Sequence, residues 1–135
     1  MSKLLQRLRD ASRSGVYRVS DERALVEATH GASLDVVAIE PGDDLFDSMA
    51  RALGFPDWFG HNWDALEDLL GDLSWRKGEG HVLVFRGHPS GEELGILCDV
   101  LRASAEYWTA RGKPFFGVFI DPAKKLALPE LYRGA

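Results

Sequence analysis

Three apolar segments that alternate with helical segments constrain the fold of this chain more than any other feature. Residues 34–40 are rich in β-branched side chains, and residues 81–85 and 115–120 are almost entirely apolar. Short apolar runs bounded by turn residues are typical of buried strands. Helical periodicity occupies residues 44–53, 63–73 and 92–111. Because strands that alternate with helices usually pair in parallel, the sequence predicts an α/β domain with a small, three-stranded parallel sheet packed with helices.

The start of the chain predicts an N-terminal extension of helix, strand and helix that packs on this domain. The pattern indicates a helix over residues 3–13, an edge strand over residues 16–19 and a helix over residues 21–30. The alternative for the basic first helix is an arm that binds a membrane surface or a partner, but its short apolar face favours docking. We expect the tail to be mobile from residue 123. The predicted boundaries are 1–33 for the extension, 34–121 for the domain and 122–135 for the C-terminal tail.

Length and composition limit the possible functions. With 135 residues, the chain is long enough for one domain whose core needs no disulfides. Its net charge of −5 argues against a nucleic-acid binder that neutralises phosphates, and suits either a basic partner or plain solubility. The single cysteine, Cys98, cannot form an internal disulfide, and we expect no secretion signal and no membrane span. These features predict a cytoplasmic protein that binds neither nucleic acid nor membranes.

The segment from residue 54 to residue 75 carries the candidate functional site. Pro56 predicts a turn, Gly60 can supply a backbone φ that other residues resist, and Asn62 is placed to cap a helix. On a helical wheel, residues 63–73 separate into an apolar side and an acidic side. The apolar positions are Trp63, Leu66, Leu69, Leu70 and Leu73. The acidic positions are Asp64, Glu67, Asp68 and Asp72.

The acidic side of this helix lacks the Lys or Arg that often offset carboxylates three or four positions away. Asp68 forms like-charge pairs with both Asp64 and Asp72, and Asp72 also opposes the helix dipole. Trp58 and Phe59 stand in the turn that precedes the helix. An unneutralised acidic surface beside aromatic side chains suits binding to a basic cleft. The alternative is an ordinary solvated helix face.

The segment also carries a resemblance to a known family. Residues 55–70, with the sequence FPDWFGHNWDALEDLL, resemble the core segment of the barstar family, the intracellular inhibitors of the ribonuclease barnase. The match is ungapped, and a similarity in the order of elements extends over residues 34–121. The resemblance implies the barstar fold and a segment that plugs the active site of a nuclease.

The resemblance implies roles for individual residues. Asp64 and Asp68 align with the two central aspartates, which would imitate substrate phosphates for basic groups of the nuclease. Trp58 takes the place of an aromatic residue that stacks on the catalytic histidine. Gly60 and Asn62 would shape the loop and offer backbone contacts to the partner.

Some positions depart from the family pattern. Glu67 stands where barstar has Trp, and Asp72 stands where barstar has Gly, so both extend the predicted acidic surface. Tyr107 aligns with a further glutamate on the last helix of barstar, and Glu106 is one position away. We leave open whether Tyr107 or Glu106 contributes to binding. These differences bear on the identity of the nuclease more than on the mode of action.

Enzymatic chemistry has little support in the sequence. His61 and Asp64 are spaced as metal ligands on a helix can be, but His61 precedes the helix and no HExxH or CxxC pattern exists. Phosphate-binding glycine loops and nucleophile elbows are also missing. The sequence predicts an inhibitor of a basic, barnase-like ribonuclease, acting as immunity against a toxin, with no catalytic residue, metal or cofactor. The alternatives are a barstar-like module for another basic partner or toxin and, less favoured, a metal-dependent hydrolase.

Overall fold

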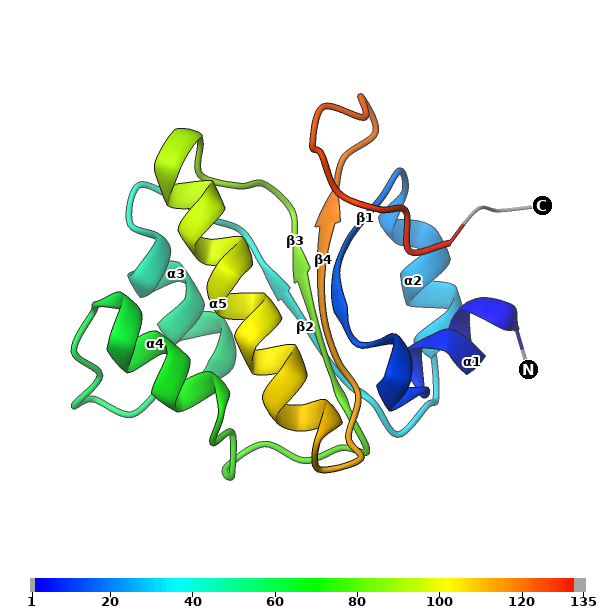
Figure 1. Ribbon diagram of the computed structural model, residues 1–135, viewed down its shortest axis with the longest axis horizontal. Coiled ribbons are helices and arrows are strands. Elements are labelled where there is room, and N and C mark those ends of the chain that lie inside the picture. Colours follow the sequence, from blue (N-terminus) through cyan, green and yellow to red (C-terminus); the bar gives the residue numbers. More distant parts are fainter. Residues whose placement is uncertain (1, 133–135) are drawn as a thin grey trace.

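The computed structural model describes residues 2–132, which form a parallel sheet between two layers of helices (Figure 1). Within these residues the strands are β1 (Gly15–Val19), β2 (Asp35–Ile39), β3 (His81–Phe85) and β4 (Phe115–Ile120). The helices are α1 (Lys3–Leu8), η1 (Ala11–Arg13, a 3-10 helix), α2 (Glu22–Thr29), α3 (Leu45–Leu53), α4 (Trp63–Leu70) and α5 (Gly91–Thr109). The predicted α/β class is confirmed.

The sheet has four strands in the part of the chain that the structure describes, and our prediction of three was wrong. All pairs are parallel, and the order is β1-β4-β3-β2. The additional strand is β1 from the extension, which pairs with β4 from Gly15 opposite Phe116 to Val19 opposite Ile120. Without β1, the edge of β4 would present unpaired backbone groups, which explains why the extension joins the sheet.

The sheet separates two hydrophobic cores. The helices α3, α4 and α5 cover one face of the sheet, and α1 and α2 cover the other (Figure 1). Strand residues alternate between the two cores: in β3, Leu83 and Phe85 belong to the first, whereas Val82 and Val84 belong to the second. Because both faces of the central strands are covered, all five residues of β3 are buried. The core under α1 and α2 contains Leu4, Leu8, Val19, Leu25, Val82, Val84, Phe116, Val118 and Leu131.

The C-terminal segment packs against the extension. Leu131 is fully buried, and its N–H donates to the Arg18 carbonyl at 3.0 Å. The Arg18 guanidinium also forms an ion pair with Glu130 at 2.9 Å. The expectation of a mobile tail is therefore wrong as far as residue 132, and residues 133–135 lie outside the described residues.

The first predicted helix is interrupted. We expected one helix over residues 3–13, but α1 ends at Leu8 and a short 3-10 turn follows. Asp10 causes the break, because its carboxylate accepts from the Ser12 N–H at 3.0 Å and caps the new turn. Among residues 2–132, no helix is long and apolar enough to cross a membrane.

Candidate functional site

The acidic helix α4 begins where the sequence predicts. The Asn62 side chain accepts from the Ala65 N–H at 2.8 Å, and its amide donates to the Gly60 carbonyl at 3.2 Å. These two bonds satisfy one free N–H of the first turn and fix the preceding turn at the same time. Asp64 lies in the first turn, where a negative charge is favourable.

The inner side of α4 is buried as predicted, but the helix is shorter than we expected. Leu66 and Leu70 are fully buried, and the Trp63 ring packs edge-on against Phe46 with 4.8 Å between centroids. The predicted helix over residues 63–73 ends at Leu70, with Gly71 as its C-cap. Leu73 remains buried, but with a left-handed φ of 50° it belongs to the loop after the helix.

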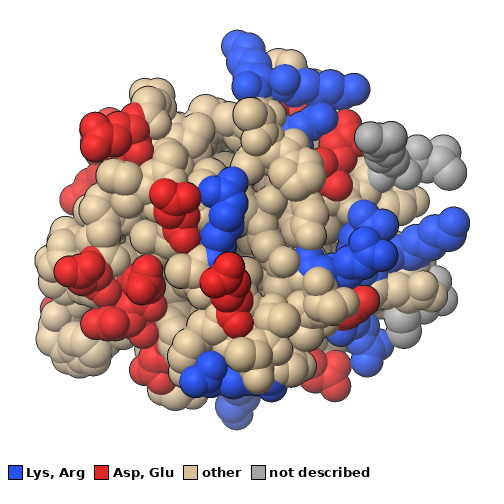
Figure 2. Space-filling model, in the orientation of Figure 1, with Lys and Arg blue, Asp and Glu red and all other residues tan. Residues whose placement is uncertain are grey.

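The outer side of α4 forms an acidic face, which we define as Asp64, Glu67 and Asp68 with Asp72 beside them. The first three are exposed on the helix, and Asp72 is exposed in the turn after it, not on the helix as predicted. Figure 2 shows acidic side chains grouped over α4 without Lys or Arg between them, whereas the basic side chains of this view lie outside that group. Within residues 2–132, none of the four carboxylates forms an ion pair or a side-chain hydrogen bond, so their charge is available to a partner.

In the aromatic loop, which we define as residues 54–62, two neighbouring aromatic side chains lie in opposite environments, one in solvent and one in the core. Trp58 is 75% exposed, whereas Phe59 is buried and packs edge-on against Phe55 with 4.9 Å between centroids. The left-handed residue of the turn is His61, with φ 51°, and not Gly60 as we expected. Gly60 instead leaves room for the Asn62 side chain, because a Cβ there would lie 3.0 Å from the amide nitrogen that Asn62 uses in the turn and would make that amide shift slightly.

A hollow of about 300 Å³ lies between α4 and α5 next to the acidic face. Glu67 and Asp68 line it from α4, and Tyr107 lines it from α5. Tyr107 is 40% exposed, and the guanidinium carbon of Arg111 lies 3.5 Å from its ring centroid. Glu106 lines a different hollow, between α5 and β1. Of the two α5 residues left open by the sequence, Tyr107 is therefore the one beside the acidic face.

The described residues offer little for metal chemistry. No group of three or more His, Cys, Asp or Glu side chains that could hold a metal ion occurs within residues 2–132. His61 precedes α4, and its ring lies 4.8 Å from that of Phe59. The histidine is therefore part of the packing of the aromatic loop.

Comparison with known proteins adds a decisive observation. Residues 29–120 match the family model described as Barstar (barnase inhibitor), which covers more than half of the chain. The chain belongs to the barstar family. The resemblance seen in residues 55–70 is thereby confirmed. No curated protein and no solved structure gives a significant match.

The barstar-family match includes β2, β3 and β4 with α3, α4 and α5, and it begins at the last residue of α2. The acidic face and the aromatic loop both lie inside it. The description of the family names its members as inhibitors of barnase. The strand β1 and helix α1 lie outside the matched residues and are additions to the barstar-family unit.

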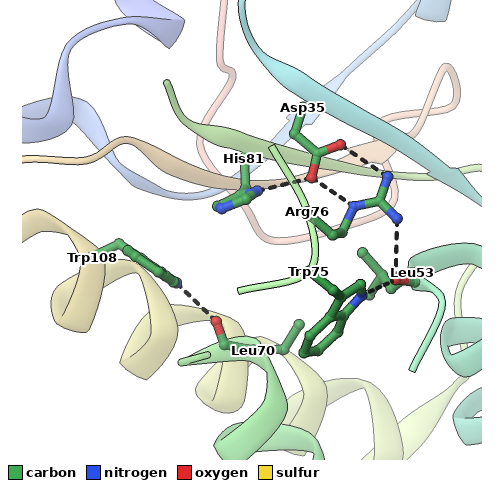
Figure 3. A network of polar contacts seen from close by, with 7 residues as sticks. All are labelled: Asp35, Leu53, Leu70, Trp75, Arg76, His81 and Trp108. Carbon is green, nitrogen blue, oxygen red and sulfur yellow. Dashed lines mark hydrogen bonds and ion pairs between the residues drawn. The ribbon is translucent and has the colours of Figure 1, made fainter. Parts of the chain in front are cut away.

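The structure also reveals a polar cluster that the sequence analysis missed, the Asp35 network of Asp35, Arg76 and His81 (Figure 3). Arg76 donates to both carboxylate oxygens of Asp35, from Nε at 2.7 Å and from Nη2 at 2.9 Å. His81 Nδ1 lies 2.9 Å from the same carboxylate. Asp35 lies 41 positions from Arg76 and 46 from His81, so these residues do not form a short sequence motif that would indicate a site.

The charge states within the Asp35 network follow from burial and contacts. Burial disfavours ionised Asp35, but the hydrogen bonds from Arg76 and His81 outweigh it and hold the pKa of Asp35 below its usual value. Burial lowers the pKa of His81 against the opposing effect of Asp35, and the charges of Lys113 and Arg76 add to the lowering. Neutral His81 then donates from Nδ1 to the carboxylate, because ionised Asp35 only accepts. Its Nε2 is buried and has no partner among the described residues.

We expect acidification to destabilise the fold through His81. Because the pKa of His81 is lower in the folded protein than its unfolded value of about 6.5, the unfolded chain takes up the proton first as the pH falls. The free energy of unfolding should therefore decrease below about pH 6.5, by at most about 1.4 kcal/mol per pH unit. Asp35 adds almost nothing above about pH 5, because its pKa is lowered in the folded protein and an unfolded aspartate takes up its proton mainly below that pH.

Urea unfolding at pH 7.5 and pH 5.5 measures this pH dependence. The His81→Gln variant should lose most of the difference between the two pH values. The His30→Gln variant is the matched control, because His30 is exposed at the end of α2. An equal pH dependence in wild type and His81→Gln would contradict the assignment.

Proposed function

We propose that this chain inhibits a ribonuclease of the barnase type by inserting the acidic face into its active site. The observation that carries the proposal is the exposure of Asp64, Glu67 and Asp68 on one short helix, without an ion pair in the part of the chain that the structure describes. A ribonuclease active site gathers cationic groups to hold phosphates. Carboxylates about one helical turn apart complement such a cluster without offering a bond to cleave.

The proposal gives each part of the site a role. Asp64 and Asp68 imitate phosphates at the centre of the contact, with Glu67 and Asp72 beside them. Trp58 stacks on a ring of the nuclease, because it projects from the aromatic loop and is 75% exposed. Gly60 and Asn62 hold the shape of that loop, and the side chain of Asn62 is already engaged in capping α4.

The proposal further places the protein in the cytoplasm, as an inhibitor without catalytic activity and without a cofactor. Its partner is a basic ribonuclease, and neither nucleic acid nor a membrane is bound directly. A reduced cytoplasm suits the unpaired Cys98, which lies on α5 and is buried in the hydrophobic core. In this role, fast capture protects a cell from its own nuclease, and opposite charges on the two proteins speed that capture.

The test is a titration of barnase activity on an RNA substrate with the purified protein. Wild type should abolish activity at a 1:1 ratio, and the Asp64→Ala/Asp68→Ala double variant should not. A pull-down from an extract of the source organism, with wild type and the double variant, identifies the natural partner. Active barnase together with specific capture of a basic protein that is not a nuclease would overturn the inhibitor proposal and favour the general binding module.

Trp58→Ala should raise the dissociation rate of the nuclease complex about 10- to 100-fold and leave the association rate nearly unchanged. An aromatic anchor at an interface is commonly worth about 2 kcal/mol or more, and most such losses appear in dissociation. Surface plasmon resonance measures both rates. Val26→Ala is a suitable control because Val26 is also an exposed apolar residue but lies on α2, outside the proposed surface. Equal dissociation rates for wild type and Trp58→Ala would remove Trp58 from the site.

Added salt should slow association. At about 0.15 M ionic strength, charges farther apart than about 8 Å are largely screened, so attraction between separated proteins weakens first. We expect the association rate with barnase to fall at least about tenfold between low salt and 0.5 M salt, with a much smaller change in the dissociation rate. Stopped-flow fluorescence at several salt concentrations checks this. A rate independent of salt would contradict electrostatic steering by the acidic face.

A further inference from the structure

The Asp35 network reaches the candidate site through the exit loop, residues 71–80, which leaves the end of α4. Arg76 Nη1 donates to the carbonyl of Leu53, the last residue of α3, at 3.1 Å. Trp75 Nε1 donates to the same carbonyl at 2.8 Å (Figure 3). The exit loop is therefore attached to the start of β2 through Asp35 and to the end of α3 through Leu53.

The exit loop also packs closely against the backbone of Asp35 and forms backbone hydrogen bonds beside it. Gly78 has φ 142°, and a Cβ there would come within 2.8 Å of the Asp35 nitrogen, so no larger residue fits without a shift. The Glu79 N–H donates to the Ser33 carbonyl at 2.6 Å, and the Asp35 N–H donates to the Gly80 carbonyl at 2.9 Å. These contacts make the loop a fixed connection between α4 and the sheet.

Both ends of the candidate site depend on this connection. The carbonyl of Leu70, at the end of α4, accepts from Trp108 Nε1 at 2.8 Å, and the Trp108 ring lies 5.4 Å from that of His81. The Trp75 ring packs edge-on against Phe55 in the aromatic loop, with 6.1 Å between centroids. The Asp35 network thus contacts, through Trp75 and Trp108, the segments on either side of the acidic face.

We propose that Arg76, held by Asp35, is a positioning residue that fixes the acidic face and the aromatic loop relative to each other. The proposal rests on the proposed inhibitor function. In this role Arg76 does not need to contact the partner, because it acts through Leu53, Trp75 and the exit loop. An inhibitor binds tightly only when its side chains are already in place, since ordering loose side chains at an interface consumes binding energy.

The alternative is that Arg76 only adds to the stability of the whole fold. In that case its loss would make all buried amides exchange faster to a similar degree, and the folded molecules that remain would bind the partner normally. If Arg76 positions α4, its loss loosens α4 and the exit loop first, while the central strands keep their protection.

The test uses Arg76→Lys in the full-length protein. Lysine keeps the charge, but a single ammonium cannot make the two-oxygen contact with Asp35 and also reach the Leu53 carbonyl as the guanidinium does. Arg51→Lys is the matched control, because Arg51 is an exposed residue on α3 that pairs with Asp47 within the same helix. Hydrogen exchange of residues 66–70 is compared with that of β3, and barnase dissociation is measured in parallel.

We expect Arg76→Lys to speed exchange in residues 66–70 at least about tenfold while exchange in β3 stays within about twofold of wild type. Barnase should dissociate about tenfold faster, with an unchanged association rate because the acidic face is intact. Arg51→Lys should resemble wild type in all three measurements. Equal acceleration of exchange in α4 and β3 would overturn the proposal, and so would unchanged dissociation.

Failure of the inhibitor function is distinguishable from failure of this inference. If wild type does not bind barnase, the proposed function fails for that nuclease. The exchange measurement needs no partner, and it still decides whether Arg76 controls the order of α4. Local loosening of α4 in Arg76→Lys supports the positioning role, and its absence contradicts it.

Discussion

The Asp64→Ala and Asp68→Ala variants are each expected to bind barnase about 30- to 5,000-fold more weakly than wild type. Loss of one partner from a desolvated, hydrogen-bonded charge pair at an interface costs about 2 to 5 kcal/mol, and about 1.4 kcal/mol corresponds to a tenfold change in affinity. The loss is large because the cationic groups of the nuclease remain buried without a counter-charge. Isothermal titration calorimetry or competition with RNA cleavage measures the affinity.

The same two variants should remain folded. Neither carboxylate has a partner within residues 2–132, so alanine removes no internal contact. Asp68→Ala also relieves the repulsion between Asp64 and Asp68, which is worth a few tenths of a kcal/mol. Glu27→Ala, which removes an exposed acid from α2, controls for net charge. A sharp fall in the thermal unfolding temperature of both site variants would show that their binding loss has a structural origin.

Asp35→Ala is expected to lower the free energy of unfolding by about 3 to 5 kcal/mol. Asp35 is 9% exposed and accepts from both Arg76 and His81, so its removal leaves the buried His81 imidazole and the partly buried Arg76 guanidinium without their acceptor. Breaking a buried ion pair from one side typically costs this much, because the remaining charge is no longer compensated. Chemical unfolding in urea at pH 7.5 measures the loss.

Two comparisons make the Asp35 prediction specific. Asp47→Ala breaks an ion pair with Arg51 whose side chains are 40% and 80% exposed, and it should cost less than about 1 kcal/mol. An Asp35→Ala/Arg76→Met double variant should be more stable than Asp35→Ala alone, since it removes the uncompensated guanidinium. A loss below about 1 kcal/mol in Asp35→Ala would mean that water replaces the carboxylate at little cost.

The part of the site that is local in sequence could be predicted from it. Asn62 as N-cap and the apolar and acidic sides of α4 follow from spacing alone, and the structure confirms both. The end of α4 could not be predicted in the same way, because Leu73 continues the apolar period and yet leaves the helix with a left-handed φ. The Leu70 carbonyl is bonded by Trp108, which is 38 positions away. A hydrogen bond from a residue so far along the chain cannot be predicted from the local sequence pattern.

The Asp35 network was missed for the same reason. Arg76 lies 41 positions and His81 lies 46 positions from Asp35, and they meet only because β2 and β3 start side by side in a parallel pair. In the sequence, Arg76 looked like one charge in a polar connection, and His81 looked like the first residue of an apolar strand. The membership of the fourth strand in the sheet also depends on tertiary pairing. The pattern of residues 16–19 indicates a strand, but it does not indicate that this strand pairs with β4.

The added strand β1 has a practical consequence for anyone who handles this protein in pieces. A fragment trimmed to the matched residues 29–120 would lack α1, β1, nearly all of α2 and the segment that contains Leu131. Its sheet would then expose Val82, Val84, Phe116 and Val118 to water along one whole face. Such a bare apolar surface promotes self-association. The residues that match the family are therefore fewer than the residues that this protein needs to cover both faces of its sheet.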